Sequence, residues 1–289
     1  MDNISICVSK AQADCYEMLL KEESHMAKIC TVGTLKGGTG KTTFTFNMAG
    51  VLAEKHKVLL IDNDPQGNLT TDVGVDVAIQ QRKSIREVFE NRKTKPEEVI
   101  IKEPVKGLPG LDIIPGHIKL IDTEVRLANR SGREQILANW FEDNWATLSK
   151  YDYIFLDTNP SMGLLNKNAF YISDKIILVS DVSFNSIQGV DLFIYLWSEA
   201  RADLRKDDNI AALVINNFDK RLNLSAEMRE YCKDRDDIME ILIDHPIPST
   251  VKMKETEIEH KPINMLHPNG AAHQAVVTVV EELKKREVL

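Results

Sequence analysis

A glycine-rich segment, Lys36-Gly37-Gly38-Thr39-Gly40-Lys41-Thr42-Thr43, restricts the possible folds of this chain more than any other stretch of it. It lies between an apolar run predicted to be a strand, Ile29–Thr34, and a run with helical spacing, Phe44–Glu54. Such a turn lets backbone N–H groups point at a phosphate, and the helix N-terminus adds a positive dipole. Lys41 would contact the β- and γ-phosphates, and the Thr42 hydroxyl would bind Mg²⁺. The segment therefore predicts a nucleotide site on an α/β fold.

Short apolar runs and helical stretches alternate along the rest of the chain. The runs predicted to be buried strands are Val58–Ile61, Leu111–Ile114, Tyr153–Leu156, Ile176–Val179, Leu213–Ile215 and Ile241–Ile243. The helical stretches include Arg133–Leu148, Asn185–Leu204, Ala226–Met239 and Gly270–Arg286. Strands that alternate with helices imply βαβ units. We therefore expect a single doubly wound α/β domain, with a mostly parallel sheet and helices on both faces.

Composition and charge exclude several other classes of protein. The hydrophobic fraction of 43% and the charged fraction of 28% are typical of a globular domain, and no apolar run is long enough for a transmembrane helix. The net charge of −8 argues against a generally basic protein that coats DNA. The cysteines Cys7, Cys15, Cys30 and Cys232 form no C-x-x-C pair and have no zinc spacing. Together with an N-terminus unlike a signal peptide, this predicts a cytoplasmic protein.

Residues 1–25 are predicted to be an N-terminal extension, and residues 26–289 the main domain. A short helix could run from Ala11 to Glu23. An alternative is that translation starts at Met26, because the codons of Lys21-Glu22-Glu23 can encode a ribosome-binding sequence. The intact mass of protein made from the native gene would decide between the two.

Two carboxylate-containing segments each follow a predicted strand. The first is Asp62-Asn63-Asp64-Pro65-Gln66-Gly67-Asn68, and the second is Asp157-Thr158-Asn159-Pro160. Carboxylates at the carboxyl ends of parallel strands point into the crevice where ligands bind. Asp62 is predicted to hold the magnesium shell, Asp64 to orient an attacking water, and Asp157 to accept hydrogen bonds from metal-bound water and Thr42. Simple turns or strand caps remain the alternative for each segment alone.

Taken together, the three segments resemble the deviant Walker A ATPases of the ParA/MinD family. The D-x-D-P-Q-G-N segment is similar to that of the ParA/Soj-type partitioning ATPases, and Asp157–Pro160 resembles the family's D-x-x-P switch. The resemblance implies that Lys36 crosses a dimer interface to the phosphates of the partner's ATP, while Lys41 acts within its own subunit. The loop departs from the standard Walker A pattern, which has glycine at position 35, where this chain has Leu35.

Two downstream features extend the resemblance to the nucleotide base. Asn216 ends a predicted strand where the family usually reads the adenine edge with a polar side chain. The stretch Ile247–Val251, with Pro248, and the later Lys261–Ile263 resemble the segment that closes over the base. Partitioning proteins commonly have arginine after that proline, whereas this chain has Ser249.

The resemblance implies an ATP-dependent DNA partitioning ATPase with ATP and Mg²⁺ as cofactors. An ATP-sandwich homodimer would bind DNA without sequence preference, which associates it with the nucleoid, and a centromere-binding ParB-type partner would trigger hydrolysis and release. The sequence adds little support for DNA binding, because acidic neighbours balance its best basic cluster. That cluster consists of Arg201, Arg205, Lys206, Lys220 and Arg221.

Three alternatives come from other functional classes. A MinD-like positioning ATPase would need an amphipathic membrane anchor, but the segment Glu281–Leu289 has balanced charge and no aromatic residue, so no stable membrane association is expected. A relative of the nitrogenase iron protein would need cysteine ligands, and only Cys232 lies downstream of Asp157. A module that does not hydrolyse ATP would lack Lys41 or Asp64, and both are present.

Overall fold

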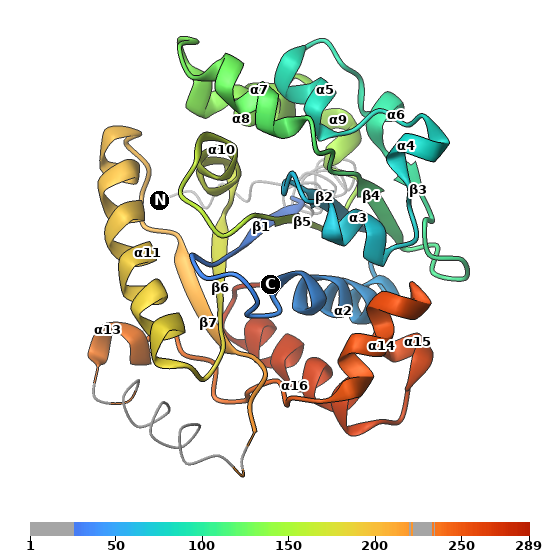
Figure 1. Cartoon of the computed structure of the whole chain (residues 1–289), viewed down its shortest axis with the longest axis vertical. Helices are drawn as coiled ribbons and strands as arrows, with labels where there is room; N and C mark the ends of the chain where they lie inside the picture. The colour runs from blue at the N-terminus through green and yellow to red at the C-terminus, as the bar shows by residue number, and fades with distance from the viewer. Residues whose placement is uncertain (1–25, 220, 222–232, 234) are drawn as a thin grey trace, which may run out of the picture.

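The computed structural model describes residues 26–219, 221, 233 and 235–289. Within these residues seven strands form one sheet in the order β3-β4-β2-β5-β1-β6-β7 (Figure 1). The strands are β1 Lys28–Gly33, β2 Val58–Asp62, β3 Ile101–Lys102, β4 Leu111–Ile114, β5 Tyr153–Asp157, β6 Lys175–Ser180 and β7 Ile210–Ile215. Neighbouring strands are parallel except for β3, which pairs antiparallel with β4. The expected mostly parallel sheet is confirmed.

Helices cover both faces of the sheet because its central strands are apolar on both sides. All five residues of β2 are buried, and they alternate between two hydrophobic clusters: Val58 and Leu60 face one, Leu59 and Ile61 the other. One face is covered by α2 Lys41–Ala53, α3 Asn68–Asp72, α14 Val251–Glu259, α15 Ile263–Leu266 and α16 Ala271–Lys285 (Figure 1). The other is covered by α5 Ile85–Glu90, α7 Leu120–Leu127, α8 Ile136–Asp143, α9 Trp145–Leu148, α10 Leu164–Ile172 and α11 Phe184–Asp203.

Four short elements complete the described part of the chain. They are α4 Val77–Gln80, α6 Pro96–Val99, the 3-10 turn η1 Arg133–Gln135 and α13 Asp236–Met239. Residues 1–25, with the predicted helix Ala11–Glu23, lie outside the described residues, and so does most of the predicted helix Ala226–Met239.

Two predicted elements were wrong. The segment Ile241–Ile243 is not a strand: Leu242 makes a single parallel bridge to Leu213, and the next hydrogen bond to β7 comes only at Ile247. The stretch Arg133–Leu148 is not one helix, because α8 ends at Asp143, and the Asn144 side chain donates to the carbonyl of Trp140 at 2.8 Å. The side-chain amide competes there with the continuing helix.

Candidate nucleotide-binding site

The predicted site residues meet at the carboxyl edge of the sheet because β1, β2 and β5 are neighbours. Asp62 and Asp157 end adjacent strands and are register partners, and Val32 pairs with Asp157 on the other side. The glycine-rich loop follows β1 directly and enters α2 at Lys41. Ligands of open parallel sheets bind at this edge. The three sequence segments therefore lie around one crevice.

Two glycines shape the loop. Gly38 has a φ of 82° and Gly40 a φ of 77°. Residues other than glycine rarely adopt this left-handed backbone conformation. A Cβ on Gly40 would also lie 2.3 Å from Nδ2 of Asn216, whereas a Cβ on Gly38 would meet nothing within 4 Å. The loop therefore needs Gly40 for its packing against the protein and Gly38 for its backbone conformation. A Cβ on Gly37 would meet one atom within 4 Å among the described residues, Cγ of Pro160 at 4.0 Å.

Lys41 and Asp157 form the centre of the site. The Lys41 ammonium lies 2.7 Å from Oδ1 of Asp157, and the two side chains are 6% and 0% exposed. The Thr42 hydroxyl donates to Oδ2 of Asp157 at 2.8 Å, and the Thr45 hydroxyl donates to Oδ1 at 3.2 Å. Asp157 thus links β5 to the first turn of α2, and the predicted contact between Asp157 and Thr42 is present. Thr45 was not predicted, although it lies one helical turn after Lys41.

Thr39 carries the observation that favours an anionic ligand in the loop. Its side chain is 1% exposed, and Oγ1 has no hydrogen-bond partner among the described residues. A buried hydroxyl without a partner costs free energy, and a phosphate oxygen would satisfy it. Thr43, by contrast, points to α14, where its hydroxyl donates to the carboxylate of Glu257.

Asp62 is the last residue of β2, and it is fully buried beside the start of α3. Its Oδ2 accepts hydrogen bonds from the backbone N–H of Thr70 at 2.8 Å and from the Thr70 hydroxyl at 2.6 Å. Burial, with the charges of Asp157 and Asp64 nearby, raises the pKa of Asp62 to about 7. Asp62 therefore fixes the start of α3 in this structure, a contact that the sequence did not indicate.

Asp64 follows two residues later, and its Oδ1 accepts a hydrogen bond from the backbone N–H of Gln66 at 2.8 Å. Burial and the charge of Asp157 raise its pKa, although Lys41 opposes this. Gly116 packs on the same turn: a Cβ there would lie 2.9 Å from both Asp62 Cγ and the Asp64 carbonyl oxygen. The backbone N–H of Gly116 also donates to the Thr70 hydroxyl at 2.8 Å.

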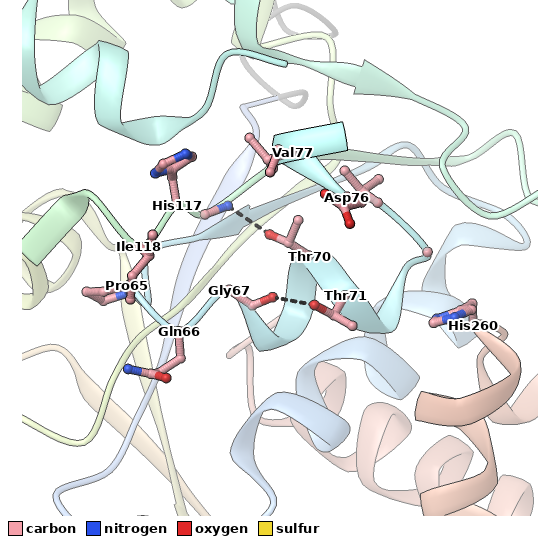
Figure 2. A pocket seen from close by; sticks show the side chains of 14 residues that line it. Pro65, Gln66, Gly67, Thr70, Thr71, Asp76, Val77, His117, Ile118 and His260 are labelled. Carbon is pink, nitrogen blue, oxygen red and sulfur yellow. Dashed lines mark hydrogen bonds between the residues drawn. The ribbon is translucent and has the colours of Figure 1, made fainter. Parts of the chain in front are cut away.

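A pocket of about 410 Å³ lies beside this turn (Figure 2). Gln66 and Gly67 of the second motif form one wall, and His117, Ile118 and His260 contribute side chains from other elements. No pattern in the sequence predicted this pocket, because α3, the loop before α7 and the end of α14 meet only in the folded protein.

Lys36 points back to its own chain. Its ammonium donates to Oγ of Ser183 at 2.5 Å and lies 3.6 Å from Oδ2 of Asp181. Both partners belong to the connection between β6 and α11. The role of Lys36 across a dimer remains a prediction, since one copy of the chain is described.

The predicted switch segment is tied to its surroundings. The Thr158 hydroxyl donates to the carbonyl of Val32 at 2.8 Å, and the Asn166 amide donates to Asn159 and to Ser161. The carboxylate of Glu124 in α7 accepts the backbone N–H of Leu165 at 3.3 Å. The segment between β5 and α10 therefore connects the centre of the site to α7.

The segments that contain Asn216 and Pro248 run beside each other, and the backbone N–H of Ile247 donates to the carbonyl of Ile215 at 2.8 Å. The segment after β7 pairs with residues 247–249, through a bridge between Phe218 and Pro248. The Asn216 amide, however, donates to the carbonyl oxygens of Thr39 at 2.7 Å and Gly40 at 3.3 Å. In this structure Asn216 positions the phosphate loop, and its contact with adenine remains a prediction.

The fold and these side chains define a class of protein: a P-loop nucleoside triphosphatase of the deviant Walker type, with a lysine at each end of its loop. A family model described as an AAA domain matches residues 27–211. The chain belongs to this family and, within it, to the ParA/Soj group.

One curated relative agrees with this assignment, and two solved structures share the fold. The sporulation initiation inhibitor protein Soj of Bacillus subtilis is 29% identical over 261 residues, which cover 89% of this chain and 98% of Soj. A plasmid partition protein of Borrelia burgdorferi B31, solved with AMPPNP, has a TM-score of 0.71 at 23% identity and covers 90% of this chain and 99% of its own. Cobyrinic acid a,c-diamide synthase of Mycobacterium smegmatis, solved with an ATP analogue and magnesium, has a TM-score of 0.68 at 26% identity, over 81% of this chain and 91% of its own.

Proposed function

We propose that residues 26–289 act as an ATP-dependent DNA partitioning ATPase. Two copies would enclose ATP between them, bind DNA without sequence preference and leave it after hydrolysis. A centromere-binding partner of the ParB type would stimulate that hydrolysis. The Borrelia burgdorferi protein supports this function, because it is described as a plasmid partition protein.

The observation that carries the proposal is the contact of Lys41 and Thr42 with one carboxylate, that of Asp157. Lys41 supplies a cation for the terminal phosphates, and Thr42 with Asp157 supplies oxygen ligands for a hard cation. The described residues hold no cluster of three or more His, Cys, Asp or Glu side chains that could bind a metal alone. This fits Mg²⁺, which is commonly held by one or two protein ligands together with phosphate oxygens and water. When bound, Mg²⁺ would neutralise charge on those oxygens.

Three further groups have distinct tasks in this proposal. The unpartnered hydroxyl of Thr39 and the backbone of Gly37 to Gly40 would hold the phosphates. Asp64 would orient the attacking water, since its raised pKa suits a group that accepts a proton. Lys36 would reach the phosphates in the other subunit and make hydrolysis depend on the dimer.

The predicted basic cluster does not by itself make a DNA-binding surface. Arg201 pairs with Asp208 and Arg221 with Asp219, and Lys220 lies outside the described residues. Binding to DNA phosphates would thus need cations brought together from both subunits of a dimer.

The test is DNA binding with ATP, with ADP and without nucleotide, over a series of salt concentrations. We expect binding only with ATP and a steep fall in affinity as salt rises. Binding that is the same in all three nucleotide states would contradict the proposal.

A MinD-like membrane ATPase is the second candidate, and lipid vesicles of anionic composition in the same assay address it. Within the described parts of the chain, none of the helices combines the length and apolar character needed to cross a membrane. Three apolar side chains at the end of α16 and beyond it are buried in the core: Leu283, Val288 and Leu289. They are therefore not available for an interfacial membrane contact in this fold, and we expect no ATP-dependent recruitment to vesicles.

A further inference from the structure

The connection between β6 and α11 forms a receptor for the side chain of Lys36. The ammonium of Lys36 lies 2.5 Å from Oγ of Ser183 and 3.6 Å from the carboxylate of Asp181. Asp181 follows β6 directly, and Ser183 is the N-cap of α11. Both partners therefore come from one short turn, 145 and more residues away from Lys36 in the sequence.

This turn is held by its own hydrogen bonds. Oδ1 of Asp181 accepts the backbone N–H of Ser183 at 2.8 Å, and the Ser183 hydroxyl donates to that of Ser186 at 3.0 Å. Burial opposes the charge of Asp181, but the hydrogen bonds from Ser183 and Ser186 and the charge of Lys36 outweigh it, so the pKa of Asp181 lies below its ordinary value. The carboxylate is thus charged and directed at a cation.

The backbone of α11 also lies close to Lys36. A Cβ added to Gly189, in the second turn of the helix, would lie 3.8 Å from Cβ of Lys36 and 3.9 Å from its backbone nitrogen. The helix therefore approaches the loop closely at a residue without a side chain, and Lys36 extends along it toward Asp181.

We infer that Asp181 and Ser183 are positioning residues that hold Lys36 on its own subunit, and that this contact opens before Lys36 reaches the phosphates of a second copy. The inference rests on the proposed function, in which Lys36 acts across the dimer. It makes the contact of Lys36 with Asp181 and Ser183 a latch, which opposes dimerisation and must be opened when ATP binds.

The strength of one latch is that of a partly exposed ion pair. The Lys36 and Asp181 side chains are 32% and 20% exposed, and such pairs change an equilibrium by about two- to fivefold. A dimer requires two latches to open, so the factors multiply to about four- to 25-fold in its dissociation constant. An effect of this size is measurable by sedimentation.

The first experiment uses the nucleotide-free protein and does not depend on dimerisation. The variant Asp181→Asn keeps an oxygen that can accept the Ser183 N–H but removes the charge. The matched control is Asp203→Asn, an exposed carboxylate at the other end of α11. We expect trace acetylation of Lys36, read by peptide mass spectrometry, to be about two- to fivefold faster in Asp181→Asn than in the control. Equal rates would show that Asp181 does not hold Lys36.

The second experiment measures the dimer dissociation constant with a non-hydrolysable ATP analogue by analytical ultracentrifugation. We expect Asp181→Asn to lower the constant by about four- to 25-fold, with Asp203→Asn equal to the unsubstituted protein. In a Lys36→Ala background the same substitution should have no effect, which a merely structural role of Asp181 would not produce.

The two experiments separate the inference from the function beneath it. An unchanged or larger dissociation constant in Asp181→Asn, with the unsubstituted protein dimeric, overturns the latch and leaves the proposed function standing. A protein that stays monomeric at every concentration, even where acetylation of Lys36 is faster in the variant, overturns the proposed function and with it the role assigned to the latch.

Discussion

The ammonium of Lys41 and the carboxylate of Asp157 form an ion pair of 2.7 Å in which both side chains are almost completely buried. Two residues 116 positions apart are thereby joined at the point where the phosphate loop enters α2. A buried pair is strongly sensitive to the loss of one partner, because the remaining charge has no solvent to compensate it.

The first prediction concerns the stability of this pair. We expect Lys41→Ala to lower the free energy of unfolding of the nucleotide-free protein by about 3 kcal/mol, since Asp157 keeps only hydroxyl donors. Urea denaturation measures this. The control is Lys252→Ala, which removes an exposed partner of Glu255 and should cost less than about 1 kcal/mol. Equal losses in the two variants would contradict the central role of the buried pair.

The second prediction concerns Lys36. We expect Lys36→Ala to reduce ATP hydrolysis at high protein concentration by about 100-fold or more, because a cation at the terminal phosphates is lost. Its affinity for the nucleotide should remain close to that of the unsubstituted protein, since Lys41 is intact. Fluorescent-nucleotide titration and a phosphate-release assay test the two parts. A large loss of nucleotide affinity would mean that Lys36 acts within its own subunit.

The third prediction concerns Asp64. We expect Asp64→Ala to bind ATP, to dimerise and to stay on DNA, with hydrolysis reduced by about 100-fold or more. The reason is that the group that orients water is removed while Lys41, Thr42 and Asp157 remain. DNA retention after a chase with ADP measures persistence, and Asp122→Ala, an exposed change on α7, is the control. Hydrolysis at the unsubstituted rate would show that Asp64 has another role.

The fourth prediction distinguishes two tasks of Asn216. Its amide holds the carbonyl oxygens of Thr39 and Gly40, so Asn216→Ala should weaken ATP and GTP binding by the same factor, about 5- to 30-fold. An adenine contact would instead reduce the preference for ATP over GTP. Titration of both nucleotides under the same conditions decides between loop positioning and base recognition.

The fifth prediction concerns pH. Burial and the charges of Glu257, Asp157 and Asp62 raise the pKa of Asp72, at the end of α3, to about 8. The folded state therefore holds this proton more tightly than the unfolded state, and the stability it provides in acid is lost as pH rises from about 4 to about 8. We expect the free energy of unfolding of Asp72→Asn to exceed that of the unsubstituted protein by an amount that grows as pH rises from 5 to 8, and that is more than about 1 kcal/mol larger above pH 8 than at pH 5.

Urea denaturation from pH 5 to pH 8.5 measures that difference. The control is Asp207→Asn, an exposed change in the loop before β7. Its free energy of unfolding should change with pH in the same way as that of the unsubstituted protein. If the difference in free energy of unfolding between Asp72→Asn and the unsubstituted protein does not grow with pH, a raised pKa of Asp72 is not its cause.

Local patterns were sufficient for the long, regular parts of the fold. The predicted strand Val58–Ile61 and helix Asn185–Leu204 lie within one residue of β2 and α11, because a short apolar run is typical of a buried strand and α11, with 20 residues, is too long for one. The segment Ile241–Ile243 is equally apolar but pairs at one residue only. β3 has two residues and is held by its partner β4, so its own sequence could not reveal it.

The sequence by itself determined the phosphate loop, its two lysines and the carboxylates that follow the strands, because each depends on short spacings and on the alternation of apolar runs. Only the tertiary structure decided what these side chains contact. The strand order brings Asp157 next to Lys41. The Thr70 hydroxyl in α3 donates a hydrogen bond to Asp62, and Lys36 donates one to Ser183 in the turn before α11. A side chain's partner depends on distances between segments remote in the chain, which no local pattern encodes.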